Sequence, residues 1–206
     1  MMKTMNWFNS RFVRMIAAVR KQLEGDKTVS DLKYPVGKFE PQPETTAARR
    51  QQLIQSIADA PSKLRQAVEG LSPQQLDAPY RPEGWTVRQT VNHVADSHLN
   101  GYIRFKFALT EHEPLIKPYE EKLWAELEDG RNTSPAVSLA LLDALHLRWV
   151  TLLRSLAPED FARTTRHPQH PEWGAMPLDW MLELYEWHGR HHTAHITSLR
   201  QRSGWS

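Results

Sequence analysis

The sequence predicts an all-α protein, a four-helix bundle with a short N-terminal helical extension, from three observations. Apolar residues recur at helical spacing in four long segments. Loops that contain proline and glycine separate these segments. No convincing strand-type alternation of apolar and polar residues accompanies them. Four amphipathic helices of this length are expected to bury their apolar faces against one another, and such bundles build ligand and metal sites in their cores.

Local capping signals place the four helices along the chain. Thr86 and Gln89 have the spacing of a capping box, and Ser134 followed by Pro135 is a typical helix start. A threonine at position 45 or 46 caps the first helix, and Gly70 ends it. The long helices are therefore expected over about residues 45–70, 86–110, 134–158 and 178–204, with a short helical piece near 120–127.

Residues 1–30 are expected to form a basic extension outside the main domain, which we assign to residues 31–206. Before Gly25 this segment carries five lysines and arginines against one glutamate. Its apolar residues recur at helical spacing, which favours a solvated or loosely packed amphipathic helix. Contact with a membrane surface or a partner is the alternative. The apolar positions are Trp7, Phe8, Phe12, Met15, Ile16 and Val19.

The composition excludes several classes of function. The chain has 206 residues and a formal net charge of +2, too small to favour nucleic acid as a partner without a local basic patch. It has no cysteine, which excludes disulfides, thiolate ligands and a cysteine nucleophile. No run approaches the roughly 18 apolar residues that cross a bilayer, so no integral membrane segment is expected.

The strongest chemical signal is a cluster of histidines in the last expected helix. On a helix, residues four apart share a face, so a His-x-x-x-His pair can bind one metal ion through two imidazole nitrogens. This spacing occurs twice, as His188 with His192 and as His191 with His195, and spacing alone does not choose between the pairs. An incidental polar or pH-titrating patch is the alternative interpretation.

A third ligand is expected from the second helix. His93 is the first candidate, because the carboxylate of Asp96 follows one turn later and could orient an imidazole or accept a proton. His98 is the rival candidate. Three protein ligands leave one side of a metal ion open, which is typical of catalytic sites. The histidines expected to have no role are His112, His146, His167 and His170.

Several separated segments resemble one known family. Residues 80–98 read YRPEGWTVRQTVNHVADSH, residues 102–106 read YIRFK and residues 187–196 read WHGRHHTAHI. Together with YPVG at 34–37 and GWS at 204–206, they resemble the YfiT-type family of the DinB-like superfamily, described as metal-dependent hydrolases. The resemblance covers about residues 31–206.

The resemblance implies a four-helix bundle, usually dimeric and cytoplasmic, that binds one divalent metal through three histidines. Carried over position by position, the implied ligands are His93, His191 and His195, with His188, His192 and His98 as neighbours. Zn²⁺ is the default ion, although imidazole ligands also suit Ni²⁺ and other divalent transition metals.

These expectations favour a metal-dependent hydrolase acting on a small-molecule electrophile. Zinc held by three imidazoles lowers the pKa of bound water to about 7, and Asp96 is the candidate general base. The same open ion could instead bind a low-molecular-weight thiol, such as bacillithiol, for transfer to the electrophile. A metal-binding stress protein without turnover is a third interpretation.

Overall fold

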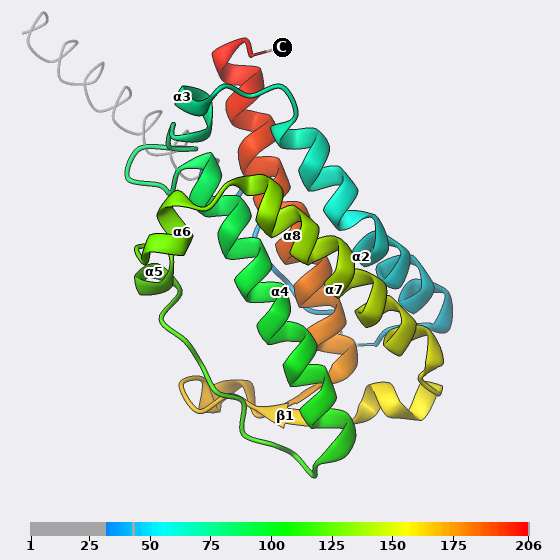
Figure 1. Ribbon diagram of the computed structural model, residues 1–206. Coiled ribbons are helices and arrows are strands. Elements are labelled where there is room, and N and C mark those ends of the chain that lie inside the picture. Colours follow the sequence, from blue (N-terminus) through cyan, green and yellow to red (C-terminus); the bar gives the residue numbers. More distant parts are fainter. Residues whose placement is uncertain (1–31, 43, 206) are drawn as a thin grey trace, which may run out of the picture.

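Four long helices run alongside one another in the computed structural model, which describes residues 32–42 and 44–205 (Figure 1). Helices α2 and α8 run in one direction, and α4 and α7 run in the opposite direction. Both α2 and α4 pack against α7 and α8, so the four helices share one core. Their bounds are Ala47–Val68 for α2, Val87–Thr110 for α4, Pro135–Ser155 for α7 and Leu178–Ser203 for α8. The predicted all-α four-helix bundle is confirmed.

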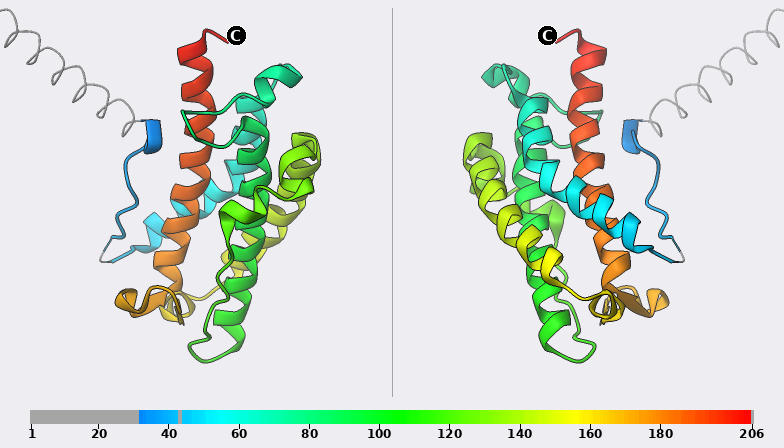
Figure 2. Two further views of the ribbon diagram at one scale, coloured as in Figure 1. Left: turned by 90° about the vertical axis from the view of Figure 1, so that its left-hand side faces the viewer. Right: turned by 90° about the vertical axis from the view of Figure 1, so that its right-hand side faces the viewer.

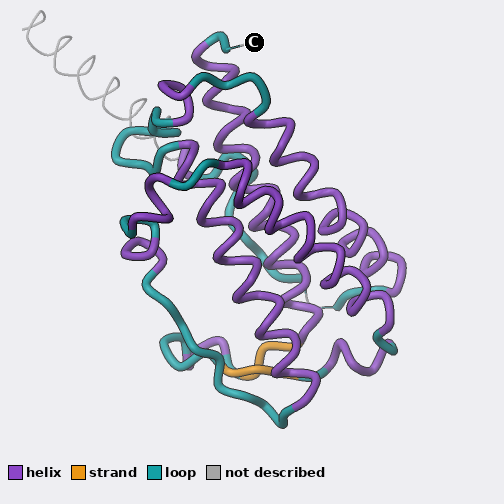
Figure 3. The backbone as a smooth tube through the Cα atoms, viewed as in Figure 1, coloured by secondary structure: helices purple, strands orange, loops and turns teal. Residues whose placement is uncertain are grey.

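Short elements connect the long helices, and two of them are strands that the sequence did not predict. Three residues are too few to show the alternation that marks a strand. The strands pair antiparallel at one end of the bundle, with Thr165 opposite Met176 (Figure 3). The short elements are α3 (Pro73–Leu76), α5 (Glu121–Trp124), α6 (Glu128–Asn132), β1 (Thr164–Arg166), β2 (Ala175–Pro177) and the 3₁₀ helices at Pro158–Ala162 and Pro171–Trp173.

The capping signals set the helix ends as expected. The Thr86 hydroxyl accepts the Gln89 backbone N–H at 3.1 Å, and the Gln89 side-chain oxygen accepts the Thr86 N–H at 3.1 Å. Thr46 is the residue that caps α2, and its hydroxyl accepts the Arg49 N–H. Gly204 ends α8 in the left-handed conformation that favours glycine, with φ at 65°.

A glycine brings α4 and α8 into close approach near their middles. A Cβ at Gly101 would lie 2.5 Å from the ring of Tyr185 and 2.8 Å from that of Trp149. No larger residue fits there without moving one of these rings, because atoms in a close-packed interior cannot overlap. Gly101 and Tyr185 therefore fix how far apart the two helices lie at this level.

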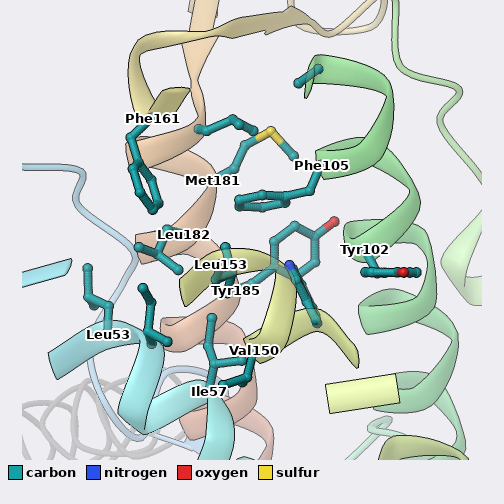
Figure 4. Packing of buried hydrophobic residues seen from close by; sticks show 14 of the residues in the cluster. Leu53, Ile57, Tyr102, Phe105, Val150, Leu153, Phe161, Met181, Leu182 and Tyr185 are labelled. Atoms are coloured by element: carbon teal, nitrogen blue, oxygen red, sulfur yellow. The ribbon is translucent and has the colours of Figure 1, made fainter. Parts of the chain in front are cut away.

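Two apolar clusters fill the core, and histidines lie between them. The larger cluster includes Trp149, Phe105 and Leu182, each at most 1% exposed (Figure 4). The smaller cluster includes Val87 and Val91 of α4. His98 packs against Trp149 and Tyr185 of the larger cluster, and His195 stacks on Tyr80 of the smaller one. Burial of these side chains supplies the main driving force for folding, at roughly 25 cal/mol for each Å² removed from water.

Residues 32–42 form the N-terminal strap, which begins with a helical turn at 32–33 and a tight turn at 35–36 and then runs beside α8 (Figure 2). The indole N–H of Trp187 donates to the Gly37 carbonyl at 3.1 Å. The carboxylate of Glu183 accepts the backbone N–H of Gln42 at 2.9 Å. These bonds hold the strap against the outer side of α8. The predicted basic extension at residues 1–30 lies outside the described residues.

Among the described residues, α7 is the one helix long and apolar enough to cross a membrane by length and composition. The expectation that the chain has no integral membrane segment stays a prediction. The apolar character of α7 has another explanation. Leu142, Trp149 and Leu153 of α7 are at most 1% exposed and pack inside the bundle. A core helix of a folded domain is apolar for this reason, so α7 is weak evidence for a membrane span.

Candidate metal centre

Seven histidines from three helices gather in the middle of the bundle. Six of them are at most 7% exposed, and His188 is half-buried. Antiparallel packing brings the middle of α4 opposite the middle of α8, which accounts for the meeting of residues far apart in sequence. The seven are His93 and His98 of α4, His146 of α7, and His188, His191, His192 and His195 of α8.

His93, His188 and His192 form the first triad, whose candidate ligand atoms all lie within 4.8 Å of one another. The Nε2 atoms of His93 and His188 are 3.2 Å apart. Two nitrogens that bind one tetrahedral Zn²⁺ at 2.0–2.1 Å are roughly 3.3–3.4 Å apart. The spacing in the first triad therefore fits a shared cation.

His191, His192 and His195 form the second triad, also with candidate ligand atoms within 4.8 Å of one another. The Nε2–H of His195 donates to the Lys33 carbonyl of the N-terminal strap at 3.2 Å. The Nδ1 atoms of all three histidines are buried and have no hydrogen-bond partner within the described part of the chain. The Tyr80 ring stacks on His195 with a centroid distance of 4.0 Å. His192 belongs to both triads.

Neither triad found among the described residues is the combination that the resemblance implied. The structure brings His191 and His195 together, but it brings His93 to His188 and His192 instead. Successive helical residues point about 100° apart, so the two His-x-x-x-His pairs of α8 face different neighbours. The implied set of His93, His191 and His195 stays a prediction about metal binding. The geometry favours His188 and His192 as the partners of His93.

Burial keeps these imidazoles neutral. Loss of hydration, followed by the proximity of His191, lowers the pKa of His93 to about 3. Desolvation is also the main cause that lowers the pKa of His191 to about 3 and that of His195 to about 4. It lowers the pKa of His188 and His192 well below the usual value. Neutral imidazole is the form that binds metals, so these histidines can act as metal ligands at pH 7 without first losing a proton.

Asp96 lies one turn after His93 on α4 and is half-buried. Burial, together with the nearby charge of Asp129, raises the pKa of its carboxyl to about 6. A pKa near the working pH suits a general base. Among the described residues, no hydrogen bond joins this carboxylate to a histidine, and the backbone carbonyl of Asp96 accepts from Asn100. Its role as a base stays a prediction.

Trp85 covers one side of the first triad. Its ring lies 4.5 Å from that of His93 and 6.3 Å from that of His192, measured between centroids. An indole at this place shields the imidazoles from water and offers a flat apolar surface to a ligand.

Sequence reasoning gave no role to His146, and it left His98 as a rival ligand. In the structure His98 bridges His146 and His188, through ring nitrogens 2.8 Å and 3.2 Å apart. One signal was present in the sequence: His146 stands between Leu142 and Trp149 on the apolar face of its helix. A buried polar side chain on such a face needs a partner.

Comparisons with known proteins agree with this fold and show the family. The profile of the DinB superfamily matches residues 56–196. The chain is 49% identical over 179 residues to "Putative metal-dependent hydrolase YfiT" of Bacillus subtilis, covering 87% of this chain and 99% of that protein. A Bacillus cereus (strain B4264) relative with the same description is 53% identical over 177 residues, covering 86% of this chain and 100% of the relative. The solved structure of YfiT from Bacillus subtilis, described as an unusual four-helix bundle, matches 85% of this chain and 99% of that chain with a TM-score of 0.83.

Proposed function

The chain belongs to the DinB superfamily, and from this membership we propose that it is a metal-dependent hydrolase whose ion is held by His93, His188 and His192. The observation that carries the proposal is the 3.2 Å spacing of the His93 and His188 Nε2 atoms, with His192 beside them. The substrate is a small-molecule electrophile. The ion is a divalent transition metal, with Zn²⁺ as our first choice because three imidazoles suit it.

The donor set supports an open site. Three neutral imidazoles supply three of the four ligands that Zn²⁺ usually takes, and the fourth position is free for water or substrate. When bound, such an ion supplies Lewis acidity and lowers the pKa of water that reaches it. Trp85 limits the access of bulk water to His93 and His192. Asp96, with its pKa raised to about 6, holds a proton-accepting carboxylate one turn from His93.

Transfer of a low-molecular-weight thiol, such as bacillithiol, is the second candidate. One observation favours it: no hydrogen bond among the described residues links the Asp96 carboxylate to the first triad. Hydrolysis benefits from a base near the nucleophile, whereas a thiol bound as thiolate needs none. The two candidates use the same ligands.

We also propose a cellular location and a binding partner for the chain. The family resemblance favours a cytoplasmic homodimer. Leu99, Ile103 and Phe107 form one face of α4 and are 36–46% exposed. An apolar stripe of this kind supports a contact with a second copy of the chain. Sedimentation of the full chain with and without Ile103→Glu tests it, and a monomer at all concentrations would remove the dimer from the proposal.

The activity is tested by loading the full chain with Zn²⁺, Ni²⁺ or Mn²⁺ and measuring ester and amide hydrolysis, beside consumption of monochlorobimane with and without bacillithiol. Thiol-independent product supports the hydrolase, and thiol-dependent consumption supports the transferase. The folded His93→Ala variant is the matched control, since it keeps the bundle and loses a ligand. Stoichiometric metal binding without turnover on either panel would favour the non-catalytic metal-binding protein.

A further inference from the structure

A line of hydrogen bonds crosses the bundle from the backbone of α2 to the first triad. The Ile57 carbonyl lies 2.7 Å from His146 Nδ1. His146 Nε2 lies 2.8 Å from His98 Nδ1, and His98 Nε2 lies 3.2 Å from His188 Nδ1. The line takes one residue from each of the four long helices. It ends at His188, whose other nitrogen faces His93.

The partners at one end determine where every proton along the line must sit. A carbonyl oxygen only accepts hydrogen bonds, so His146 Nδ1 carries the hydrogen. A neutral imidazole has one N–H, so His146 Nε2 accepts and His98 Nδ1 donates. By the same rule His98 Nε2 accepts and His188 Nδ1 donates. His188 Nε2 then carries a lone pair that faces His93 Nε2, 3.2 Å away.

Burial keeps the imidazoles of His98 and His146 neutral. His98 is 0% exposed and His146 is 2% exposed. A charged imidazolium in such a place would lose nearly all its hydration. The His98 ring also lies nearly perpendicular to the rings of Trp149 and Tyr185, with centroids 5.9 Å and 5.7 Å away, and this packing restricts its rotation.

We propose that His98 and His146 are positioning residues that fix His188 as the Nδ1–H tautomer and so present its Nε2 lone pair to the metal. Without them, His188 could carry its proton on Nε2, the atom needed for coordination. Outer partners of metal-bound histidines act in this way generally, although they are more often carboxylates or carbonyls. The inference rests on the proposed function for the ligand role of His188.

The tautomer can be read directly in the full chain without metal. Long-range ¹H–¹⁵N correlation spectra distinguish protonated from unprotonated imidazole nitrogens, and His188→Ala assigns the signals. We expect a protonated Nδ1 and an unprotonated Nε2 on His188. A proton on His188 Nε2 would overturn the proposal, whatever the metal affinity is.

Two variants at one position test the connection to metal binding. His146→Leu removes the acceptor for His98, and we expect Zn²⁺ affinity, measured by chelator competition, to fall by about 10- to 100-fold with the Nδ1–H signature of His188 lost. His146→Gln offers an amide that can donate to Ile57 and accept from His98, so both readouts should largely recover. The matched control is His112→Leu, at an exposed histidine away from the line.

A folded His146→Leu variant with unchanged tautomer and unchanged affinity would refute the positioning role. If His146→Leu does not fold, the unaltered chain and His146→Gln still decide through the spectrum of His188. A chain that binds no metal but shows the expected His188 tautomer refutes the proposed function while supporting the tautomer assignment.

Discussion

The two triads have the same spacing on α8 but different surroundings. In the first, His93 from α4 brings its Nε2 to 3.2 Å from that of His188, and His98 occupies the other His188 nitrogen. In the second, the Lys33 carbonyl of the strap accepts from one nitrogen of His195, and three buried Nδ1 atoms find no partner among residues 32–42 and 44–205. An i, i+4 histidine pair on one helix therefore gains the geometry of a candidate metal site that joins two helices only when the neighbouring helix places a third imidazole opposite it.

The first prediction tests which triad binds the metal ion, by replacing single histidines of each triad. His188→Ala is expected to abolish stoichiometric metal binding, a loss larger than the roughly 100-fold that marks removal of an outer partner. His191→Ala and His195→Ala are expected to keep one ion per chain. Metal content after dialysis measures this, with circular dichroism as the fold control. Loss of the ion in His195→Ala and its retention in His188→Ala would restore the set implied by the family resemblance.

The second prediction concerns the carboxylate near the first triad. Asp96→Asn is expected to lower hydrolysis by about 100-fold, within the usual range for a general base, while metal content stays the same. Because the pKa of Asp96 is raised to about 6, the unaltered enzyme should lose rate as the pH falls below 6 and protonates this base. The pH profile of kcat/KM measures both effects. An Asn variant with full activity would favour thiol transfer.

The third prediction concerns how much folding stability the buried histidines of the two triads cost at acidic pH. Unfolded histidine titrates near 6.5, whereas the pKa of folded His93 is lowered to about 3. The unfolded chain therefore takes up the proton first, so stability is fully present above about pH 6.5 and is lost as the pH falls toward the folded value. In that window His93 alone removes up to about 1.4 kcal/mol for each pH unit.

Urea unfolding of the metal-free chain at pH 5.5 and 7.5 measures this loss. His93→Gln and His195→Gln should each reduce the difference in unfolding free energy between the two pH values, because each removes one buried titrating group. Identical stability at both pH values would show that the histidines are not buried as neutral groups.

The smallest expected effect is at Gly189. A Cβ there would lie 3.3 Å from His98 Cε1, close enough to displace that ring slightly. Gly189→Ala should therefore weaken metal binding by at most about tenfold, below the effect of breaking the line at His146. Chelator competition measures it, and the paired control is Ala194→Gly on the same helix. A gain in affinity would contradict the role given to His98.

Local signals predicted the helices well, because they act over a few residues. The capping box of Thr86 and Gln89 forms as expected, and α4 begins at the next residue. The three-residue strands β1 and β2 were not predictable, since they pair only because the chain folds back at one end of the bundle.

The candidate site was predictable only in part. The helices and the histidine cluster followed from the sequence, and His93 does meet two histidines of α8. Which pair it meets depends on the rotation of α8 about its axis, and that is set by packing against α2, α4 and α7. The place of His146 depends on α7 lying beside α4, which no spacing within one helix can reveal.

The close approach at Gly101 also bears on the spacing of the buried histidines. His98 lies three residues before Gly101 on α4, and His188 lies three residues after Tyr185 on α8. Because the two helices are antiparallel, these imidazoles lie at the same level of the bundle. A larger side chain at position 101 would push α4 and α8 apart. The distance between the His98 and His188 imidazoles would then increase, because both lie within one helical turn of this contact. The small size of Gly101 therefore helps to set the 3.2 Å distance between His98 Nε2 and His188 Nδ1.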